Sequence, residues 1–168
     1  MSRECSVYLV DTNIIISAII KGEIVRKCLT TCTTHYLIPK PVIEELSELL
    51  TTKALQDIAS RIEKALKKGK ITIEELLARE IELIAILLRQ PNIEYIDVKP
   101  SEDDLRKAEE IIGYRDPDDI PIVAIALSLA KTYKVENVCI WTDDRDILDE
   151  LQRKNVEVKA FSKPHCCK

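Results

Sequence analysis

The chain has 168 residues, which is the usual size of one domain. Hydrophobic residues make up 46% and charged residues 32%, so the composition is typical of a folded, helix-rich protein. The formal net charge of −4 provides no overall positive field that would attract nucleic acid or an anionic membrane, and any polyanion must bind locally. With 3 glycines and 2 histidines, Gly-rich nucleotide loops are excluded and a Ser-His-Asp hydrolase is hard to assemble.

Short apolar strands alternate with helices along the chain. A β-rich run at residues 6–10 is followed by Asp11, Thr12 and Asn13, whose side chains can cap a helix that begins at Ile14. The elements predicted after it, in chain order, are a helix at 23–31, a strand at 36–38, helices at 41–50, 53–68 and 73–89, a strand at 93–98, helices at 102–112 and 117–133, a strand at 137–141, a helix at 142–153 and a strand at 156–161.

This alternation predicts an α/β fold. Parallel strands are joined by right-handed crossovers that place helices on both faces of the sheet. We therefore expect a single domain over residues 1–168, with three layers (α/β/α) around a mostly parallel central sheet of about five strands. The two consecutive helices at 53–68 and 73–89, broken at Gly69, would form a helical hairpin inserted at residues 53–89.

The six cysteines are expected to be reduced thiols, because a chain of this size can fold without disulfides and no C-x-x-C pair is present. Cys28 and Cys32 lie one helical turn apart and the tail contains Cys166 and Cys167, but structural zinc sites use two sets of spaced pairs. The longest apolar stretch is shorter than the roughly 18–20 residues of a membrane span, and no apolar leader begins the chain. We expect a cytoplasmic protein without a membrane partner.

Acidic residues follow the ends of the predicted strands. In an open parallel sheet, the loops at the carboxyl ends of the strands gather at one edge, where such folds place their sites. The acids expected to meet there are Asp11, Glu44, Glu45, Asp116, Asp118, Asp119, Asp143, Asp144 and Asp146.

Capping is the simpler explanation for each acid taken alone. Asp116 with Asp119, and Asp143 with Asp146, have the N-cap and N3 spacing of a capping box. Three acids remain after these caps are assigned: Asp11, Asp118 and Asp144. Two carboxylates about 4 Å apart repel by about 4 kcal/mol at an effective dielectric of 20, so a cluster of them needs a cation.

Oxygen ligands without a nearby His or Cys select hard ions, so Mg²⁺ or Mn²⁺ is the expected cofactor. Such an ion would orient a phosphodiester, lower the pKa of a bound water and stabilise the leaving oxygen, without a covalent nucleophile. The acidic pattern thus favours metal-dependent phosphoryl hydrolysis.

Four segments resemble, in order, the acidic motifs of PIN domains. They lie at residues 8–17, 41–46, 116–127 and 141–148, the last with a Thr-x-Asp-x-Asp pattern, and the resemblance spans residues 7–161. By position, the catalytic and metal-binding acids of the family correspond to Asp11, Glu45, Asp119 and Asp144, with Asp146 as a further metal ligand. The resemblance also implies orienting polar residues at Thr12, Asn13, Asp116 and Thr142. Whether Glu44 or Glu45 faces the metal is left open.

The resemblance implies a metal-dependent endoribonuclease, either the toxin of a toxin–antitoxin pair or an RNA-processing nuclease. Its expected partners are single-stranded RNA, an antitoxin or another protein, and a second copy of the chain. The alternative is a non-catalytic RNA-binding or scaffold module in which the acids only cap helices. A receiver-like or dehalogenase-like phosphotransfer domain ranks low, because Asp11-Thr12-Asn13 lacks the second acid two residues on.

The predicted hairpin has an apolar and a basic surface. Its apolar residues are expected to form core: Leu76, Leu77, Ile81, Ile84, Leu87 and Leu88. Leu83 and Ile86 widen the apolar arc beyond one stripe, so a dimer face is the alternative. Its basic residues could contact RNA phosphates, although Lys-rich helix surfaces are usually only solvated: Arg61, Lys64, Lys67, Lys68 and Lys70.

Overall fold

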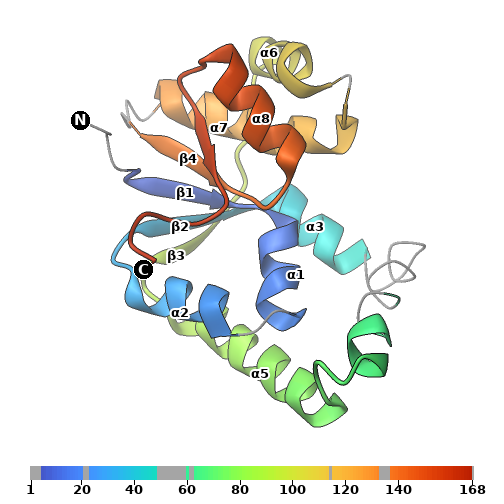
Figure 1. Cartoon of the computed structure of the whole chain (residues 1–168). Coiled ribbons are helices and arrows are strands. Elements are labelled where there is room, and N and C mark those ends of the chain that lie inside the picture. Colours follow the sequence, from blue (N-terminus) through green and yellow to red (C-terminus); the bar gives the residue numbers. More distant parts are fainter. Residues whose placement is uncertain are drawn as a thin grey trace.

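A five-stranded parallel sheet forms the centre of the structure, in the strand order β3-β2-β1-β4-β5 (Figure 1). This is a computed structural model, and it describes residues 5–20, 23–48, 60, 63–113, 115–132 and 137–167. The strands of the sheet are β1 (Val7–Val10), β2 (His35–Pro39), β3 (Ile93–Ile96), β4 (Val138–Trp141) and β5 (Lys159–Phe161).

Helices cover both faces of this sheet. Figure 1 shows α1, α2 and α5 on one side and α6, α7 and α8 on the other, so the predicted three-layer α/β/α fold is confirmed. The bounds of the helices are α1 (Thr12–Ile20), α2 (Glu23–Thr31), α3 (Lys40–Glu48), α5 (Ile73–Arg89), α6 (Glu102–Ile112), a 3₁₀ turn η1 (Pro117–Asp119), α7 (Ile120–Thr132) and α8 (Arg145–Lys154). Within the described ranges, none of the helices has the length and apolar character needed to cross a membrane.

The central strands are apolar on both faces because both faces are covered. Every residue of β4 is buried, and Tyr8, Leu9 and Val10 of β1 are buried as well. This is the pattern of strands inside a doubly covered parallel sheet. On the face towards α2, the Tyr36 ring lies 5.6 Å from that of Trp141, centroid to centroid. The core therefore fixes the carboxyl ends of β1 and β4 firmly beside each other.

Most predicted elements are found at or near their predicted positions. The bounds of α2, α5 and α6 agree with the predicted ones, whereas β5 is shorter than predicted. The predicted helix at 117–133 begins as the 3₁₀ turn η1 and becomes α-helical at Ile120. The first arm of the predicted hairpin falls mainly outside the described residues, although residues 63–67 are helical.

The prediction of which α5 residues face the core is wrong. Ile81, Ile84 and Leu88 are 69%, 56% and 73% exposed, whereas Leu83 and Ile86 are buried in the core. Leu87 is partly buried against the core. The error has a physical cause: α5 is apolar around most of its circumference, so the periodicity does not select one face. The side chains of Leu76 and Leu77 lie outside the described part of the helix.

The predicted free thiols are also contradicted. The six cysteines form three disulfides, Cys5–Cys139, Cys28–Cys167 and Cys32–Cys166. Each bridge joins residues at least 134 positions apart, and the fold brings their Cα atoms to 5.2–5.9 Å, within the range that a disulfide requires. Spacing along the chain could not reveal these pairs, because they arise from the tertiary fold.

Candidate metal centre

The acidic cluster forms where β1 and β4 end side by side. Val10 pairs with Trp141 in the sheet, and the backbone N–H of Asp11 donates to the carbonyl of Trp141 at 3.0 Å. Asp11 follows β1 directly, and Asp144 lies in the loop that follows β4. Parallel pairing thus brings together two acids that are 133 positions apart, at the edge predicted for the site.

Asp11 is the most deeply buried acid of the cluster, with 7% of its surface exposed. One carboxylate oxygen accepts from the Thr12 N–H at 2.7 Å, and the other accepts from the Thr142 hydroxyl at 2.6 Å. Burial raises the pKa of Asp11 to about 6, although these two hydrogen bonds lower it, and the charges of Glu45 and Asp144 raise it further. Asp11 therefore has a fixed orientation and an unfavourable charge.

Asp119, at the end of η1, has a more strongly raised pKa than Asp11. Burial raises its pKa to about 8, with further contributions from the charges of Asp11, Asp144, Asp116 and Glu45. Its Oδ2 atom is buried and has no hydrogen-bond partner within the described ranges. A buried carboxylate oxygen normally has a partner, because leaving one unpaired costs about 1–3 kcal/mol or more.

One carboxylate oxygen from each of Asp116, Asp119 and Asp144 lies within 4.8 Å of the others, which is close enough for one cation to contact all three. Hard divalent ions prefer such oxygen ligands. The unpartnered oxygen of Asp119 and the all-carboxylate donor set both fit Mg²⁺ or Mn²⁺.

Of the two adjacent glutamates in α3, Glu45 faces the cluster. Its Oε2 accepts a hydrogen bond from the Thr12 hydroxyl, and its charge raises the pKa values of Asp11 and Asp119. Glu44 pairs instead with Lys40, at 3.8 Å. The sequence left this choice open, and the geometry favours Glu45.

Asp144 serves both as a cap and as a member of the cluster. Its Oδ1 accepts from the N–H groups of Asp146 and Ile147 at the start of α8, at 2.7 and 3.4 Å. The cap is therefore Asp144 and not Asp143, so the expectation that Asp144 would be left over after capping is wrong. The other oxygen of Asp144 is not used by the cap.

Asp146 takes a different position from the one expected of a metal ligand. It pairs with Arg115 at 2.9 Å, and Arg115 also pairs with the buried Glu150 at 3.2 Å. The structure thus brings Asp116 into the three-acid group and leaves Asp146 outside it. Sequence reasoning missed Arg115 and Glu150, and no motif marks either of them.

Asn13 and Thr142 tie the loops after β1 and β4 together. Asn13 donates to the Thr142 hydroxyl at 3.2 Å and accepts from the N–H of Asp143 at the same distance. The Thr142 hydroxyl donates to Asp11 and accepts from the N–H of Asp144. These contacts orient the carboxylate of Asp11 and fix the backbone just before Asp144.

Comparison with known protein families matches residues 9–159 to the PIN domain. The chain belongs to the PIN domain family. A search of curated proteins found no match. Membership indicates a nuclease-type function, and PIN domains typically use divalent metals. The acidic cluster lies within the matched region, at the edge of the sheet where the four sequence motifs meet.

Proposed function

We propose that this PIN domain is a metal-dependent endoribonuclease that hydrolyses RNA phosphodiester bonds. The observation that carries the proposal is the buried Oδ2 of Asp119, which lies in a cluster of carboxylates and accepts no hydrogen bond from any residue that the structure describes. Capping does not explain this atom, because the cap at η1 is Asp116. Without a cation the cluster is costly, as the raised pKa values of Asp11 and Asp119 indicate.

Asp119 and Asp144 would hold the ion, Mg²⁺ or Mn²⁺, together with Asp116, which completes the three-acid group. Asp11 and Glu45 lie outside that group, but their charges raise the pKa of Asp119, and we propose that they contribute the remaining carboxylate ligands. When bound, the ion would supply Lewis-acid stabilisation of phosphate charge and an activated water. Each carboxylate oxygen has two acceptor directions, so the oxygens of Asp11 that accept hydrogen bonds can still face a cation.

Other residues of the chain would orient the acids and limit the number of ions that the acids bind. Thr142 fixes Asp11, and Thr12 fixes Glu45, so the two carboxylates approach the cluster from different elements. Arg115 holds Asp146 away from the three-acid group, which favours one ion over two. Asp146 would then act as a ligand only if its pair with Arg115 opened.

The test is cleavage of an end-labelled single-stranded RNA in Mg²⁺ or Mn²⁺ against EDTA. Asp119→Asn keeps the shape of the side chain and removes its charge, and we expect it to lose cleavage. Asp118→Asn is the matched control, because Asp118 is adjacent, acidic and exposed. Both variants must be shown to fold by circular dichroism. Metal-independent cleavage, or equal loss in both variants, would contradict the proposal.

A non-catalytic RNA-binding or scaffold module is the second candidate, and a specific observation favours it. Asp116 and Asp144 do cap η1 and α8, so part of the cluster has a structural role. For such a module we expect RNA binding without cleavage and no effect of Mg²⁺ or Mn²⁺ on thermal stability.

The finer assignments rest on the nuclease proposal. We propose an RNA-processing nuclease or the toxin of a toxin–antitoxin pair, acting in the cytoplasm, with an antitoxin or another protein and a second copy of the chain as partners. The exposed lysines at 64–70 could contact RNA phosphates, although Lys67 pairs with Glu63 at 2.6 Å. Arg61, predicted to join them, lies outside the described residues.

A further inference from the structure

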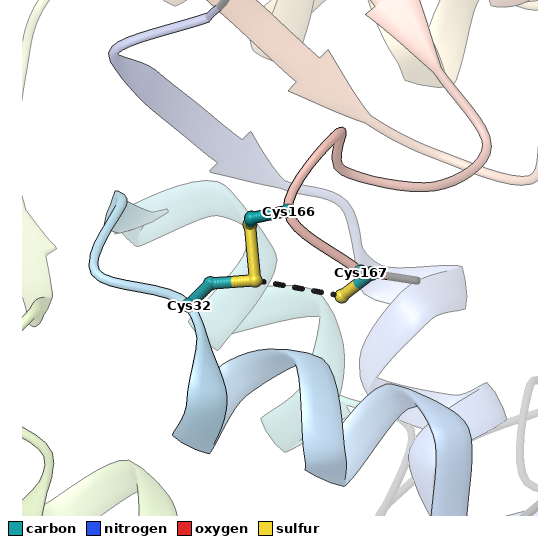
Figure 2. Close-up of side chains that lie close together, drawn as sticks. All are labelled: Cys32, Cys166 and Cys167. Carbon is teal, nitrogen blue, oxygen red and sulfur yellow. Dashed lines mark hydrogen bonds between the residues drawn. A yellow bond between two sulfur atoms is a disulfide. The ribbon is translucent and has the colours of Figure 1, made fainter.

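Four of the six cysteines meet where the C-terminal tail lies against α2. Cys28 lies in α2, and Cys32, four residues further on, directly follows the last residue of this helix. Cys166 and Cys167 are neighbours in the tail. The disulfides are Cys28–Cys167 and Cys32–Cys166, with Cα atoms 5.2 and 5.6 Å apart. Figure 2 shows the Cys32–Cys166 bridge with the side chain of Cys167 pointing towards it.

The sulfur atoms converge more closely than two separate disulfides require. Cys32 Sγ lies 3.7 Å from Cys167 Sγ, to which it is not bonded (Figure 2). The sulfurs of Cys32, Cys166 and Cys167 all lie within 4.8 Å of one another, and Cys28 is bonded to Cys167. In a tetrahedral zinc site with Zn–S bonds of about 2.3 Å, neighbouring sulfurs are about 3.8 Å apart. The Cys32–Cys167 separation matches such a tetrahedral edge.

We propose that, when both disulfides are reduced, Cys28, Cys32, Cys166 and Cys167 form a four-thiolate site for a soft divalent cation such as Zn²⁺. The Cys28–Cys32 spacing is C-x₃-C, within the range of structural zinc sites, and the tail supplies the other two ligands. Thiolates select zinc over the hard ions that carboxylates prefer. This site is therefore chemically distinct from the acidic cluster.

The burial of the cluster fits a structural metal site. Cys28, Cys32 and Cys167 are buried, whereas Cys166 is exposed. The thiols thus lie in a mostly dry environment that is open to solvent on one side. A cation can enter from that side, and the buried ligands would then shield it from water.

Contacts other than the disulfides join the tail to the strands of the sheet. The indole N–H of Trp141 donates to the Ser162 carbonyl at 3.2 Å, and the backbone N–H of His165 donates to the Tyr8 hydroxyl at the same distance. The rings of Phe161 and His165 are also in contact, with centroids 4.6 Å apart. These contacts run up to the residue before Cys166, so reduction need not displace the ligands.

Opening the two disulfides requires a reductant, for which we propose a dithiol. Two dithiol molecules break the two S–S bonds, each giving two electrons and two protons, and each becomes a cyclic disulfide. Four protein thiols result. Binding one Zn²⁺ then releases four protons as the thiolates form. In the reverse direction, two molecules of a small disulfide accept the four electrons and become dithiols, the two protein S–S bonds form again and the Zn²⁺ is released. The redox state of the compartment would thus select between a bridged tail and a metal-bound tail.

The full-length protein, reduced with dithiothreitol and freed of it under anaerobic conditions, is titrated with Co²⁺. We expect one equivalent to produce thiolate-to-cobalt charge-transfer absorption and tetrahedral ligand-field bands, and Zn²⁺ to abolish both. The oxidised protein should show neither. Carboxylates cannot produce sulfur charge-transfer bands, so this result is independent of the acidic cluster and of nuclease activity.

Matched double variants locate the site. Cys166→Ser/Cys167→Ser should lose the bands, whereas Cys5→Ser/Cys139→Ser, which removes the remaining bridge, should keep them. If the tail variant fails to fold by circular dichroism, the exposed Cys166→Ser alone should shift the bands to a three-sulfur spectrum. Absence of charge-transfer bands in the reduced native protein, or their persistence unchanged in the tail variants, would overturn the proposal.

Discussion

Replacing Asp119 by Asn should stabilise the metal-free protein at neutral pH. Burial and the neighbouring charges raise the pKa of Asp119 from 3.8 to about 8. Between these values the folded protein retains a proton that the unfolded chain has released. The free energy of unfolding contributed by this group therefore falls as the pH rises through that window, and the contribution is fully unfavourable above about pH 8.

The size of the stability gain follows from the difference between the assay pH and the pKa of Asp119 in the unfolded chain. At pH 7, about 3 units above 3.8, the limiting penalty is about 4 kcal/mol, since each unit corresponds to about 1.4 kcal/mol. Solvent reaches the half-buried side chain and screens its neighbours, which reduces the expected gain to about 2 kcal/mol. Asparagine cannot ionise, so it removes this penalty. For a chain of this length the gain corresponds to a rise in Tm of about 4–8 °C.

Thermal and urea denaturation in EDTA at pH 4 and pH 7 would measure the effect. We expect the Asp119→Asn variant to exceed the native protein in stability at pH 7 and to equal it at pH 4. Asp118→Asn, at the exposed neighbouring position, should match the native protein at both pH values. An Asp119→Asn gain of the same size at both pH values, or no gain at pH 7, would refute the electrostatic reasoning.

Three further results are expected. An ion concentration of 100 times the Kd, for Mg²⁺ or Mn²⁺, should add about 2.7 kcal/mol to the free energy of unfolding and so raise the Tm of the native protein. In a thermal-shift assay, Asp144→Asn should reduce this rise in Tm. Thr142→Val should lower the free energy of unfolding, measured in urea, by about 1–3 kcal/mol, because the buried Asp11 carboxylate then lacks its hydroxyl donor. A decrease smaller than the error of the measurement would contradict the orienting role of Thr142. If the exposed apolar side chains of α5 form a dimer face, Ile84→Glu should reduce the sedimentation coefficient to that of a monomer, and a native protein that already sediments as a monomer would contradict this.

Local patterns suffice to predict much of the fold. The bounds of α2, α5 and α6 follow from helical periodicity with caps or breakers in the sequence, such as the capping box at Thr72. The order of strands and helices predicts the parallel sheet, because crossovers need helices. For the same reason the edge at which the acids gather can be deduced, since Asp11 directly follows a strand.

What cannot be predicted depends on contacts between distant segments. Asp116 and Asp146 are both acids beside a helix start, and only the pairing of Asp146 with Arg115 separates them. The choice between Glu44 and Glu45 likewise depends on Thr12, which lies 33 residues before Glu45. Spacing in the sequence contains neither relation.

The acidic cluster and the cysteine cluster lie at opposite ends of the same sheet. The acids follow the carboxyl ends of β1 and β4, whereas Cys28 and Cys32 precede the amino end of β2. Because all five strands are parallel, these positions belong to opposite edges. A hard ion and a soft ion could then be held by one domain without competing for ligands, since carboxylates and thiolates select different cations. Reduction of the two disulfides of the tail would accordingly create the capacity to bind zinc. The positions of the carboxylates and the pH dependence of stability that they cause would stay unchanged.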